Sequence, residues 1–545
     1  MKRILLCISA ALLCAGAASA QRTSYDTGGV AIDPHSVTAM DLFNLSQTQF
    51  NFGTARSAAM AGAFTSLGAD MSSMSINPAG LGMYRHNEVA VTPMMSFSRS
   101  ETSAAPFEKG NRNRFSLGNL GFVLKLRESA KGITAINLGF GYNRLADFNY
   151  RYSLASHGQS SSIADAYARQ LRGSDISSGY LKSDQFYWGD VDPSLWGASL
   201  GYFTGLVSDA SGTWNRDMIA PSAEVGQFAT VASKGSVGEY VISLGMNINN
   251  KVYVGASLGI HSISVRRNIY YGENYQYSSE PSLAYRMDYF NYDQSTKISG
   301  AGVNFKIGVV YRPIEGLRLG FAFHTPTYYS LTYKYRGGMT SDVKSIGSNP
   351  DGYELDSEGY LNPPLSESTA LLVDDGSYSW EYISPSRMLF GASYTFGSFA
   401  VISVDYERDW YNGIRVKQSP YGKGLYDNFA RDNFKGSNTL RIGAEVRVIP
   451  QIALRAGYGL WASALKDSSA IFSSPVIYRT DYVGAGIGFT LSKTVFLDLA
   501  YQYRHDKLTD YMTYYYYNDV DEGSSPVYRT TLNRHSAILT LGFRF

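Results

Sequence analysis

The sequence predicts an all-β fold, a transmembrane antiparallel β-barrel of about 14 strands. Three observations support this prediction: apolar and polar residues alternate in many short segments, the connections between these segments are short and long in turn, and the chain ends on phenylalanine. Alternation with a period of two places successive side chains on opposite faces of a strand. One face of each strand can then meet lipid and the other can line a lumen.

The amino-acid composition limits the classes of protein to which the chain can belong. The 545 residues include 54 Gly and 43 Tyr, only 17% are charged, and no apolar run after the first twenty residues is long enough for a membrane-spanning helix. Many Gly, many aromatic residues and short alternating segments together are typical of exported β-sandwich arrays and of outer-membrane barrels. The formal net charge of +2 is too small to indicate a nucleic-acid partner.

The first twenty residues, "MKRILLCISAALLCAGAASA", predict a cleaved signal peptide over residues 1–20. They have a basic start, a short apolar run and a small-residue end before Gln21. Both cysteines of the chain, Cys7 and Cys14, lie in this leader. We therefore expect an exported mature chain without cysteine, which excludes disulfides, thiolate metal sites and a cysteine nucleophile.

Alternation is clear in "TLRIGAEVRVIPQIALRAGYGLW", which reads as two strands joined by a turn at Ile449-Pro450. A soluble sandwich would bury the same apolar face in a core, so periodicity alone does not choose between a sandwich and a barrel. Strands are expected at 87–100, 113–127, 132–150, 236–250, 251–268, 296–313, 315–335, 376–396, 398–412, 436–448, 450–461, 478–491, 493–507 and 529–545.

Connection lengths favour the barrel. The connections after even-numbered strands are very short, as in "ESAK", "NNK", "FGS" and "LSK". Those after odd-numbered strands are long, notably 151–235, 269–295, 336–375, 413–435 and 508–528. Short turns at one rim and long loops at the other are the outer-membrane arrangement. The pattern predicts a barrel over 87–545, an N-terminal segment over 21–86, long extracellular loops, and both termini on the periplasmic side.

The last strand, "HSAILTLGFRF", places Ala537, Leu539, Leu541, Phe543 and Phe545 on one face. A final strand that ends on Phe resembles the assembly signal that the barrel-insertion machinery of Gram-negative outer membranes reads. We interpret Leu541, Phe543 and Phe545 as that signal, and we expect the protein in the outer membrane of a Gram-negative bacterium.

The segment 53–84, "GTARSAAMAGAFTSLGADMSSMSINPAGLGMY", has no strand alternation and is rich in small residues. A periplasmic tether and a first strand of the wall are alternative interpretations, although its Gly content would weaken a strand.

This segment resembles the FadL and TodX family of outer-membrane transporters for long-chain fatty acids and aromatic hydrocarbons. The resemblance rests on Gly62-Ala63-Phe64, Gly68-Ala69-Asp70 and Asn77-Pro78-Ala79-Gly80-Leu81, in this order over about thirty residues. Later segments are similar too, at 139–150, 302–313, 323–333 and 404–411. The resemblance implies a fourteen-stranded barrel whose lumen is plugged by 53–84, hereafter the hatch, with the hatch residues Gly62, Phe64, Asp70, Asn77, Pro78, Ala79, Gly80 and Leu81.

The family resemblance also implies a side opening at a kinked third strand, through which cargo leaves into the bilayer. In "GFGYNRLADFNY" polar residues occupy positions expected to face lipid, which fits a local break. The residues predicted for this opening are Gly139, Gly141, Asn143, Arg144, Asp147 and Asn149.

Charged residues alternate with the apolar ones on consecutive later strands and should face the lumen as a ladder of cross-strand pairs. They are Asp405, Glu407, Arg441, Glu445, Arg447 and Arg455. Two carboxylates on one strand could suggest acid–base chemistry, but no His stands beside them, and the seven His show no metal-ligand spacing. We expect no enzyme activity, no metal and no cofactor.

Two features of the long loops are predicted. In 151–235, "SSSIADAYARQL" has helical spacing at Ile163, Ala166, Tyr167 and Leu171, which predicts a short helix over the mouth. The Tyr-rich loops, such as "IYYGENYQYSSE", indicate an aromatic girdle at the membrane edge, or an amphipathic surface that receives hydrophobic ligands.

The sequence thus predicts a channel for passive uptake of hydrophobic molecules, such as long-chain fatty acids, by hatch movement and lateral release. The expected partners are the hydrophobic cargo, outer-membrane lipid and the insertion machinery, with no nucleic acid. The alternatives are a general or sugar-selective porin and a surface-binding barrel with adhesive loops.

Overall fold

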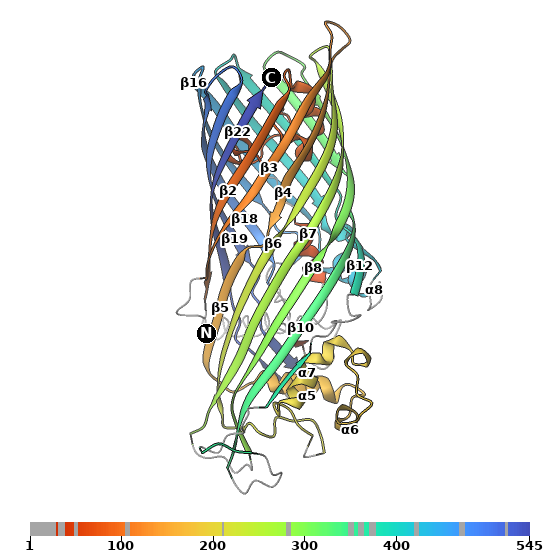
Figure 1. Cartoon of the computed structure of the whole chain (residues 1–545), viewed down its shortest axis with the longest axis vertical. Helices are drawn as coiled ribbons and strands as arrows, with labels where there is room; N and C mark the ends of the chain where they lie inside the picture. The colour runs from red at the N-terminus through yellow and green to blue at the C-terminus, as the bar shows by residue number, and fades with distance from the viewer. Residues whose placement is uncertain are drawn as a thin grey trace, which may run out of the picture.

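The computed structural model is a tall β-barrel with helices at one end and a folded segment inside (Figure 1). It describes residues 29–30, 39–47, 53–103, 110–209, 212–278, 285–346, 354–357, 365–369, 378–418, 424–467, 475–517 and 522–545. The predicted signal peptide, residues 1–20, lies outside these ranges.

The wall is a closed antiparallel barrel of 14 strands, as predicted, because the last strand pairs with the first. In chain order the wall strands are β2 (Glu88–Thr102), β3 (Gly110–Glu128), β4 and β5 (Ile133–Asp147, Tyr150–Gln159), β6 (Glu224–Ile248), β7 (Val252–Gln276), β8 (Tyr285–Tyr311), β9 and β10 (Leu317–His324, Tyr328–Ser345), β12 and β13 (Tyr378–Ile383, Arg387–Phe396), β14 and β15 (Ala400–Trp410, Arg415–Gln418), β16 (Gly436–Ile449), β17 (Ile452–Trp461), β18 (Ile477–Thr490), β19 (Val495–Leu508) and β22 (Thr530–Arg544). Where two strands are named together, a short interruption divides one wall strand.

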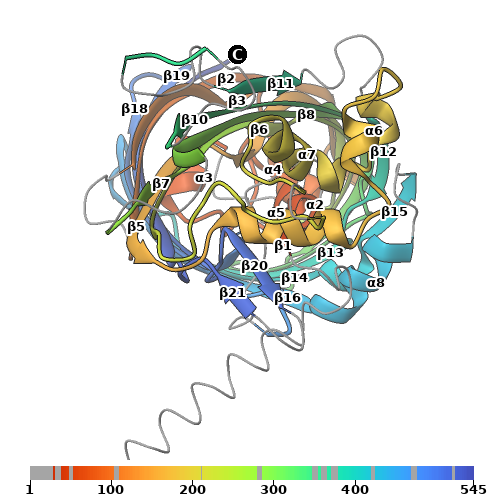
Figure 2. The ribbon, with the colours of Figure 1, turned by 90° about the horizontal axis from the view of Figure 1, so that it is seen from below.

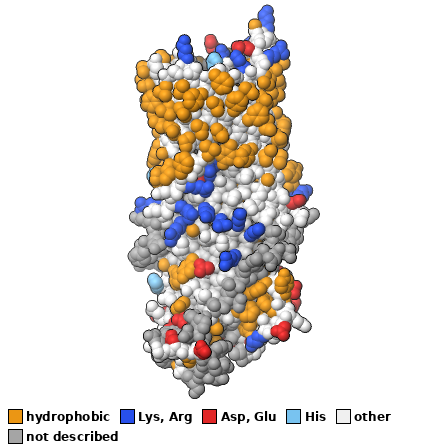
Figure 3. All heavy atoms as spheres, in the orientation of Figure 1, with side chains coloured by type: hydrophobic (Ala, Val, Ile, Leu, Met, Phe, Trp, Pro, Cys, Tyr) orange, Lys and Arg blue, Asp and Glu red, His pale blue; other side chains and the backbone are white. Residues whose placement is uncertain are grey.

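The alternating sequence produces an apolar outer surface. In β6, Ile242 and Leu244 point outward and are 45% and 41% exposed, whereas the alternate residues Val241 and Ser243 are buried inside. Equivalent apolar side chains on the neighbouring strands form a continuous belt around the half of the barrel that carries the C-terminus (Figure 3). A belt of this kind is the surface that a barrel presents to lipid.

The two ends of the barrel differ. The short connections gather at the end that carries the C-terminus, here called the turn end, and the long ones at the opposite loop end (Figure 1). Asn249 and Asn250, in the connection between β6 and β7, have φ of 54° and 55°, a left-handed conformation that Asn tolerates in tight turns. Phe543 and Phe545 point outward at the turn end and are 43% and 64% exposed.

Several wall strands extend far beyond the apolar belt. β6 has 25 residues and β8 has 27, whereas about 9–11 suffice to cross a membrane. They therefore run into the predicted loops 151–235 and 269–295, and β10 runs into 336–375. The sequence pattern hid these extensions because their outward residues are polar and their inward residues include many tyrosines.

A cap of short elements covers the loop end (Figure 2). None of the described helices is long and apolar enough to cross a membrane. The cap and the remaining loops contain α5 (Ile163–Arg172), α6 (Ser178–Leu181), α7 (Trp196–Phe203), η2 (Trp188–Asp190), η3 (Pro193–Leu195), η4 (Tyr411–Gly413), α8 (Gly424–Asn433), β11 (Ser366–Thr369), β20 (Tyr514–Tyr517) and β21 (Glu522–Ser524).

The predicted helix over the mouth is α5. Ser162 caps its N-terminus in a capping box with Asp165. The helix residues Ile163, Tyr167 and Leu171 are buried. The four residues with helical spacing all face the interior of the cap, so this prediction is confirmed.

Tyrosines of the loop end pack inside the cap and not around a membrane edge. Tyr271, Tyr275, Tyr511 and Tyr528 belong to one buried cluster with α5. Burial raises the pKa of Tyr514 well above its ordinary value, and its neutral hydroxyl donates to the carbonyl of Ser161 at 2.8 Å. The aromatic-girdle interpretation was therefore wrong for these residues, whose rings form a core.

The first described residues of the chain lie at the loop end. β1 (Gly29–Val30) pairs with β20, and α2 (Ala39–Ser46) follows within the barrel. Asp41 of α2 forms an ion pair of 3.1 Å with Arg267 of β7. The described chain therefore passes from the cap into the lumen before the wall starts. The C-terminus lies at the turn end, as predicted, and the N-terminus of the prediction lies outside the described residues.

Candidate functional site

The hatch fills the middle of the lumen. It contains α3 (Ala55–Ala59), α4 (Ser73–Ile76) and η1 (Pro78–Met83), joined by tight turns. All eight predicted hatch residues, from Gly62 to Leu81, are buried there. Their residue types suit a crowded lumen, because small side chains allow close backbone approach. Their part in opening the channel stays a prediction.

Asn77 connects the two halves of the hatch to the wall. Its side-chain oxygen accepts a hydrogen bond of 3.1 Å from the amide of Ala79, which caps η1, and Pro78 occupies the first helical position. Its side-chain nitrogen donates to the Thr65 carbonyl at 2.6 Å and lies 3.4 Å from the Val309 carbonyl of β8. One amide group thus fixes three segments together.

Asp70 forms hydrogen bonds that hold the first half of the hatch together. The hydroxyl of Thr54, the N-cap of α3, donates to its carboxylate at 2.9 Å, and the amide of Ser72 donates to it at the same distance. These bonds hold the start of α3 against the turn that leads to α4.

Inward-facing glycines of the wall accommodate the hatch backbone. Gly443 of β16, Gly457 of β17 and Gly484 of β18 lie opposite one another in register. A side chain at Gly443 would come within 2.7 Å of the Met60 carbonyl, and Gly457 and Gly484 meet the same part of the hatch. The high Gly content therefore reflects the plug, and a glycine row on consecutive strands is the sequence signal that could have located its contact surface.

Gly139 and Gly141 belong to this contact surface. Both lie in β4 and pair regularly with Val123 and Gly121 of β3. A side chain at either position would come within 2.7 Å of Met74 in the hatch. They lie just before the break and contact the hatch, and their part in a side opening stays a prediction.

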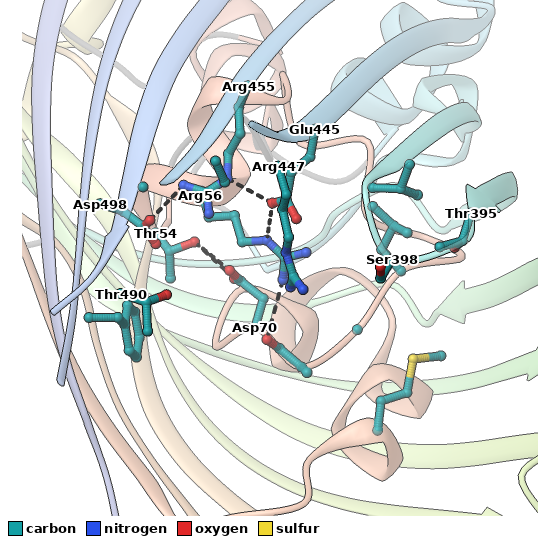
Figure 4. Close-up of a pocket in the computed structure, with 18 of the residues that line it drawn as sticks. Thr54, Arg56, Asp70, Thr395, Ser398, Glu445, Arg447, Arg455, Thr490 and Asp498 are labelled. Carbon is teal, nitrogen blue, oxygen red and sulfur yellow. Dashed lines mark hydrogen bonds and ion pairs between the residues drawn. The ribbon is translucent and has the colours of Figure 1, made fainter. Parts of the chain in front are cut away.

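Charged residues connect the hatch to the wall at the turn end (Figure 4). Glu445 of β16 lies 2.9 Å from Arg56 of the hatch and 2.7 Å from Arg455 of β17, and Arg455 lies 2.6 Å from Asp498 of β19. These four groups border a polar cavity of about 440 Å³ between hatch and rim. The chain of alternating charge is neutral, so each buried charge has a partner.

The other predicted ladder residues also face inward. Asp405 accepts a hydrogen bond of 2.7 Å from the Thr65 amide of the hatch. Glu407 pairs with Arg441 and, at 3.2 Å, with Arg387. Arg447 is exposed at the rim of the same cavity. This arrangement is structural pairing, as the ladder interpretation expected.

A second buried charge cluster was missed by the sequence analysis. Glu239 of β6 pairs with Lys306 of β8, lies 3.2 Å from His261 Nε2 of β7, and accepts a hydrogen bond from Ser75 of the hatch. All three wall residues are at most 2% exposed. The signal was available, because "NFKIG" places Lys306 on the polar face of an otherwise clear alternation.

The pairing of β3 with β4 is interrupted. Their ladder begins where Glu128 pairs with Ala135 and ends where Asn119 pairs with Asn143. Beyond that point β3 continues to Gly110 and is paired only with β2. Near Gly110 the wall closes again, because Ser100 of β2 donates to the carbonyl of Arg151 in β5. We call the unpaired stretch, Gly110–Gly118 of β3 opposite β4 and β5, the β3–β4 break.

Polar side chains fill the break from inside. Arg144 donates to the Leu117 carbonyl at 3.1 Å and pairs with Asp147 at 3.4 Å. Arg114 donates to Asn149 at 2.6 Å, and Arg534 of β22 lies 3.6 Å from Asp147. Asn143, Arg144 and Asn149 are buried, so these polar residues do not face lipid as their alternation had indicated; they turn inward because β4 leaves β3 here.

A continuous apolar cluster, here called the apolar column, leads from the cap to the break. Trp196 of α7 packs against Tyr335 of β10 with ring centroids 5.6 Å apart. The same cluster contains Phe64 of the hatch and Leu145 and Ala146 of β4, which lie beside the break. Its further members include Leu42, Val191, Ile263, Leu331, Tyr333, Trp380 and Tyr382.

A comparison with family models matches residues 222–545 to the family described as outer membrane protein transport protein (OMPP1/FadL/TodX). The chain belongs to this family. A comparison with curated protein sequences gave no match. The chain is also similar to the crystal structure of a Pseudomonas aeruginosa FadL homologue, with a TM-score of 0.52 and 10% identity over 91% of this chain and 99% of that one.

The toluene transporter TodX of P. putida is another similar structure, with a TM-score of 0.48 and 12% identity over 91% of this chain and 99% of that one. Membership of the FadL/TodX family places the protein in the outer membrane of a Gram-negative bacterium. The turn end then faces the periplasm, and the cap faces the cell exterior.

Proposed function

We propose that this FadL/TodX-family channel takes up hydrophobic molecules passively, with long-chain fatty acids or similar lipophilic compounds as cargo. Cargo enters beneath the cap, moves along the apolar column as the hatch shifts, and leaves sideways into the membrane through the β3–β4 break. No chemical step is part of this proposal.

The observation that carries the proposal is the continuity of the apolar column from Trp196 in the cap to Ala146 beside the break. A long acyl chain gains about 0.8 kcal/mol for each methylene removed from water. Partition into an apolar path can therefore draw cargo from the exterior without an energy source.

Two features support lateral release over axial passage. Below the column, the hatch is fastened to the wall by Asn77, Arg56 and the glycine contacts, and the cavity beyond it is lined by charges. Beside the column, β3 has no strand partner on its β4 side along Gly110–Gly118, and the side chains of Arg144 and Arg114 make hydrogen bonds there. Side chains rearrange faster and at lower cost than a paired strand.

The test compares intact cells with and without the protein for uptake of a labelled long-chain fatty acid and of a labelled hydrophilic sugar of similar mass. The proposal expects the protein to accelerate entry of the fatty acid at least tenfold and to leave sugar entry unchanged. Accelerated sugar entry would instead indicate an open aqueous porin and would refute the proposal.

A further inference from the structure

Four basic side chains lie in one row on the outer surface of the barrel. Lys234 of β6 is directly opposite Arg266 of β7, Arg266 is opposite Lys297 of β8, and Lys297 is opposite Lys334 of β10. All four are exposed and point away from the lumen. Figure 3 shows Lys and Arg gathered in a band on this face, outside the apolar belt. We call these four residues the basic row.

The basic row has no counter-charge among the residues that the structure describes. In the part of the chain that the structure describes, none of the four side chains makes an ion pair or a side-chain hydrogen bond. Among the described strand residues, the nearest outward carboxylates in register are Asp293 on β8 and Glu381, which pairs opposite Ser330. Each lies four positions from the row, about 13 Å along the strand. Like charges directly opposite one another destabilise a sheet, so the row favours an external anion.

The position of the row relative to the belt indicates which anion. The last belt residues on the same strands are Tyr240, Ile260, Val303 and Tyr328, which also lie opposite one another and are 41–62% exposed. On every strand the basic row lies six positions from the last belt residue, toward the loop end. For strands tilted by about 40°, six positions correspond to about 15 Å along the barrel axis.

Small and hydroxyl side chains occupy the outward positions between belt and row. They are Ser236, Gly238, Ser262, Ser264, Ser299, Ala301, Ser330 and Thr332. The surface therefore has three bands in sequence: apolar, hydroxyl-rich and basic. Hydroxyl groups suit hydrogen bonding with sugars, and Lys and Arg suit phosphates.

We propose that this face binds a phosphorylated glycolipid of the outer leaflet, of the lipopolysaccharide class. Its acyl chains lie along the belt below Tyr240 and Val303, its sugars cover the hydroxyl band, and its phosphates pair with the basic row. A phospholipid carries its phosphate next to its acyl chains and would leave the row, about 15 Å further out, without a partner.

The test titrates detergent-solubilised full-length protein with purified lipopolysaccharide. The variant Lys234→Gln/Arg266→Gln/Lys297→Gln/Lys334→Gln should bind at least tenfold more weakly than the wild type. A matched control removes four exposed charges at the turn end, as Arg127→Gln/Lys131→Gln/Lys251→Gln/Lys493→Gln, and should bind like the wild type. Equal binding by the basic-row variant, or an equal loss in the control, would overturn the proposal.

Two further probes identify the source of the anion. Dephosphorylated lipopolysaccharide should bind the wild type at least tenfold more weakly, and equal binding would overturn the proposal. Inorganic phosphate at the same concentration should not compete, and full competition would indicate a simple anion site and also overturn it. If the quadruple variant does not fold, the single variant Lys297→Gln, at the centre of the row, should still weaken lipopolysaccharide binding about threefold.

Discussion

The side-chain amide of Asn143 in β4 donates a hydrogen bond of 2.7 Å to the hydroxyl of Ser75 in the hatch. Asn143 is also the wall residue at which pairing between β3 and β4 ends, opposite Asn119. The point where the wall opens is thus bonded directly to the plug. Ser75 in turn donates to Glu239, so a shift of the hatch would disturb the break and the buried charge cluster together.

Replacement of this amide should loosen the hatch. Asn143→Leu removes the bonds to Ser75 and to Asn119, which donates to Asn143 at 2.7 Å. Leaving these buried groups unsatisfied costs about 1–3 kcal/mol, which corresponds to a rise of about 5-fold to 140-fold in the population of open channels if the closed state bears the whole cost. Single-channel conductance in planar bilayers measures that rise. Ser536→Ala, which removes a wall-to-wall bond to Ser96, is the control and should show no increase.

The glycine row should be required to seat the hatch. Gly443→Val would place its side chain within 2.7 Å of the Met60 carbonyl, so the hatch must shift while the wall pairing stays intact. We expect faster proteolysis of residues 53–84 and a higher conductance than in the wild type. Gly413→Ala, at a site with open space around it, should leave both unchanged. An unchanged proteolysis rate in Gly443→Val would contradict the described contact.

The ion pairs of Glu445 with Arg56 and Arg455 should stabilise the protein, because each buried charge needs its partner. Glu445→Gln leaves Arg56 without its carboxylate partner and reduces the pairing of Arg455. Breaking a buried pair in this way costs about 3 kcal/mol, to be measured as the free energy of unfolding in urea with lipid vesicles. The double variant Glu445→Gln/Arg56→Met should lose less than the sum of the single losses. Additive losses would show that the two residues do not interact.

The apolar column should narrow when its member beside the break is enlarged. Ala146 is 2% exposed and packs inside the wall opposite Val237. Ala146→Trp fills this position, and we expect fatty acid uptake to fall at least fivefold while the protein still folds. Ala301→Trp adds the same ring on the outer surface of β8 and should leave uptake unchanged. Equal uptake by both variants would remove Ala146 from the route.

The strand count could be predicted because loop length alternates with strand number, and alternation marks each lipid-facing strand, as in Leu440 to Val448 of β16. The extensions of β6 to β8 were not predicted. In these extensions outward residues such as Lys234 of β6 and Asp293 of β8 are polar, so the contrast between faces that reveals a strand is absent. Tyr271 and Tyr292 then read as loop aromatics although they form a core.

The candidate site was predictable only in part. The hatch was placed through Asn77 to Leu81, whose resemblance to a family is independent of periodicity. The contact between Ser75 and Asn143 joins residues 68 positions apart, and no local pattern reports such a pair. The same limit applies to β1, because pairing of Gly29 with Tyr515 depends on the whole barrel being assembled.

The central claim, that cargo passes only when the hatch moves, is tested most directly by fastening the hatch to the wall. The hydroxyl oxygens of Ser66 in the hatch and Ser403 in β14 lie 3.5 Å apart, which is compatible with a disulfide in Ser66→Cys/Ser403→Cys. The control Ser96→Cys/Ser536→Cys joins two wall strands that are already paired, with oxygens 3.1 Å apart. We predict that the oxidised hatch variant loses fatty acid uptake, that a reductant restores it, and that the control transports in both states. Undiminished uptake by the oxidised hatch variant, with its disulfide verified, would contradict the account.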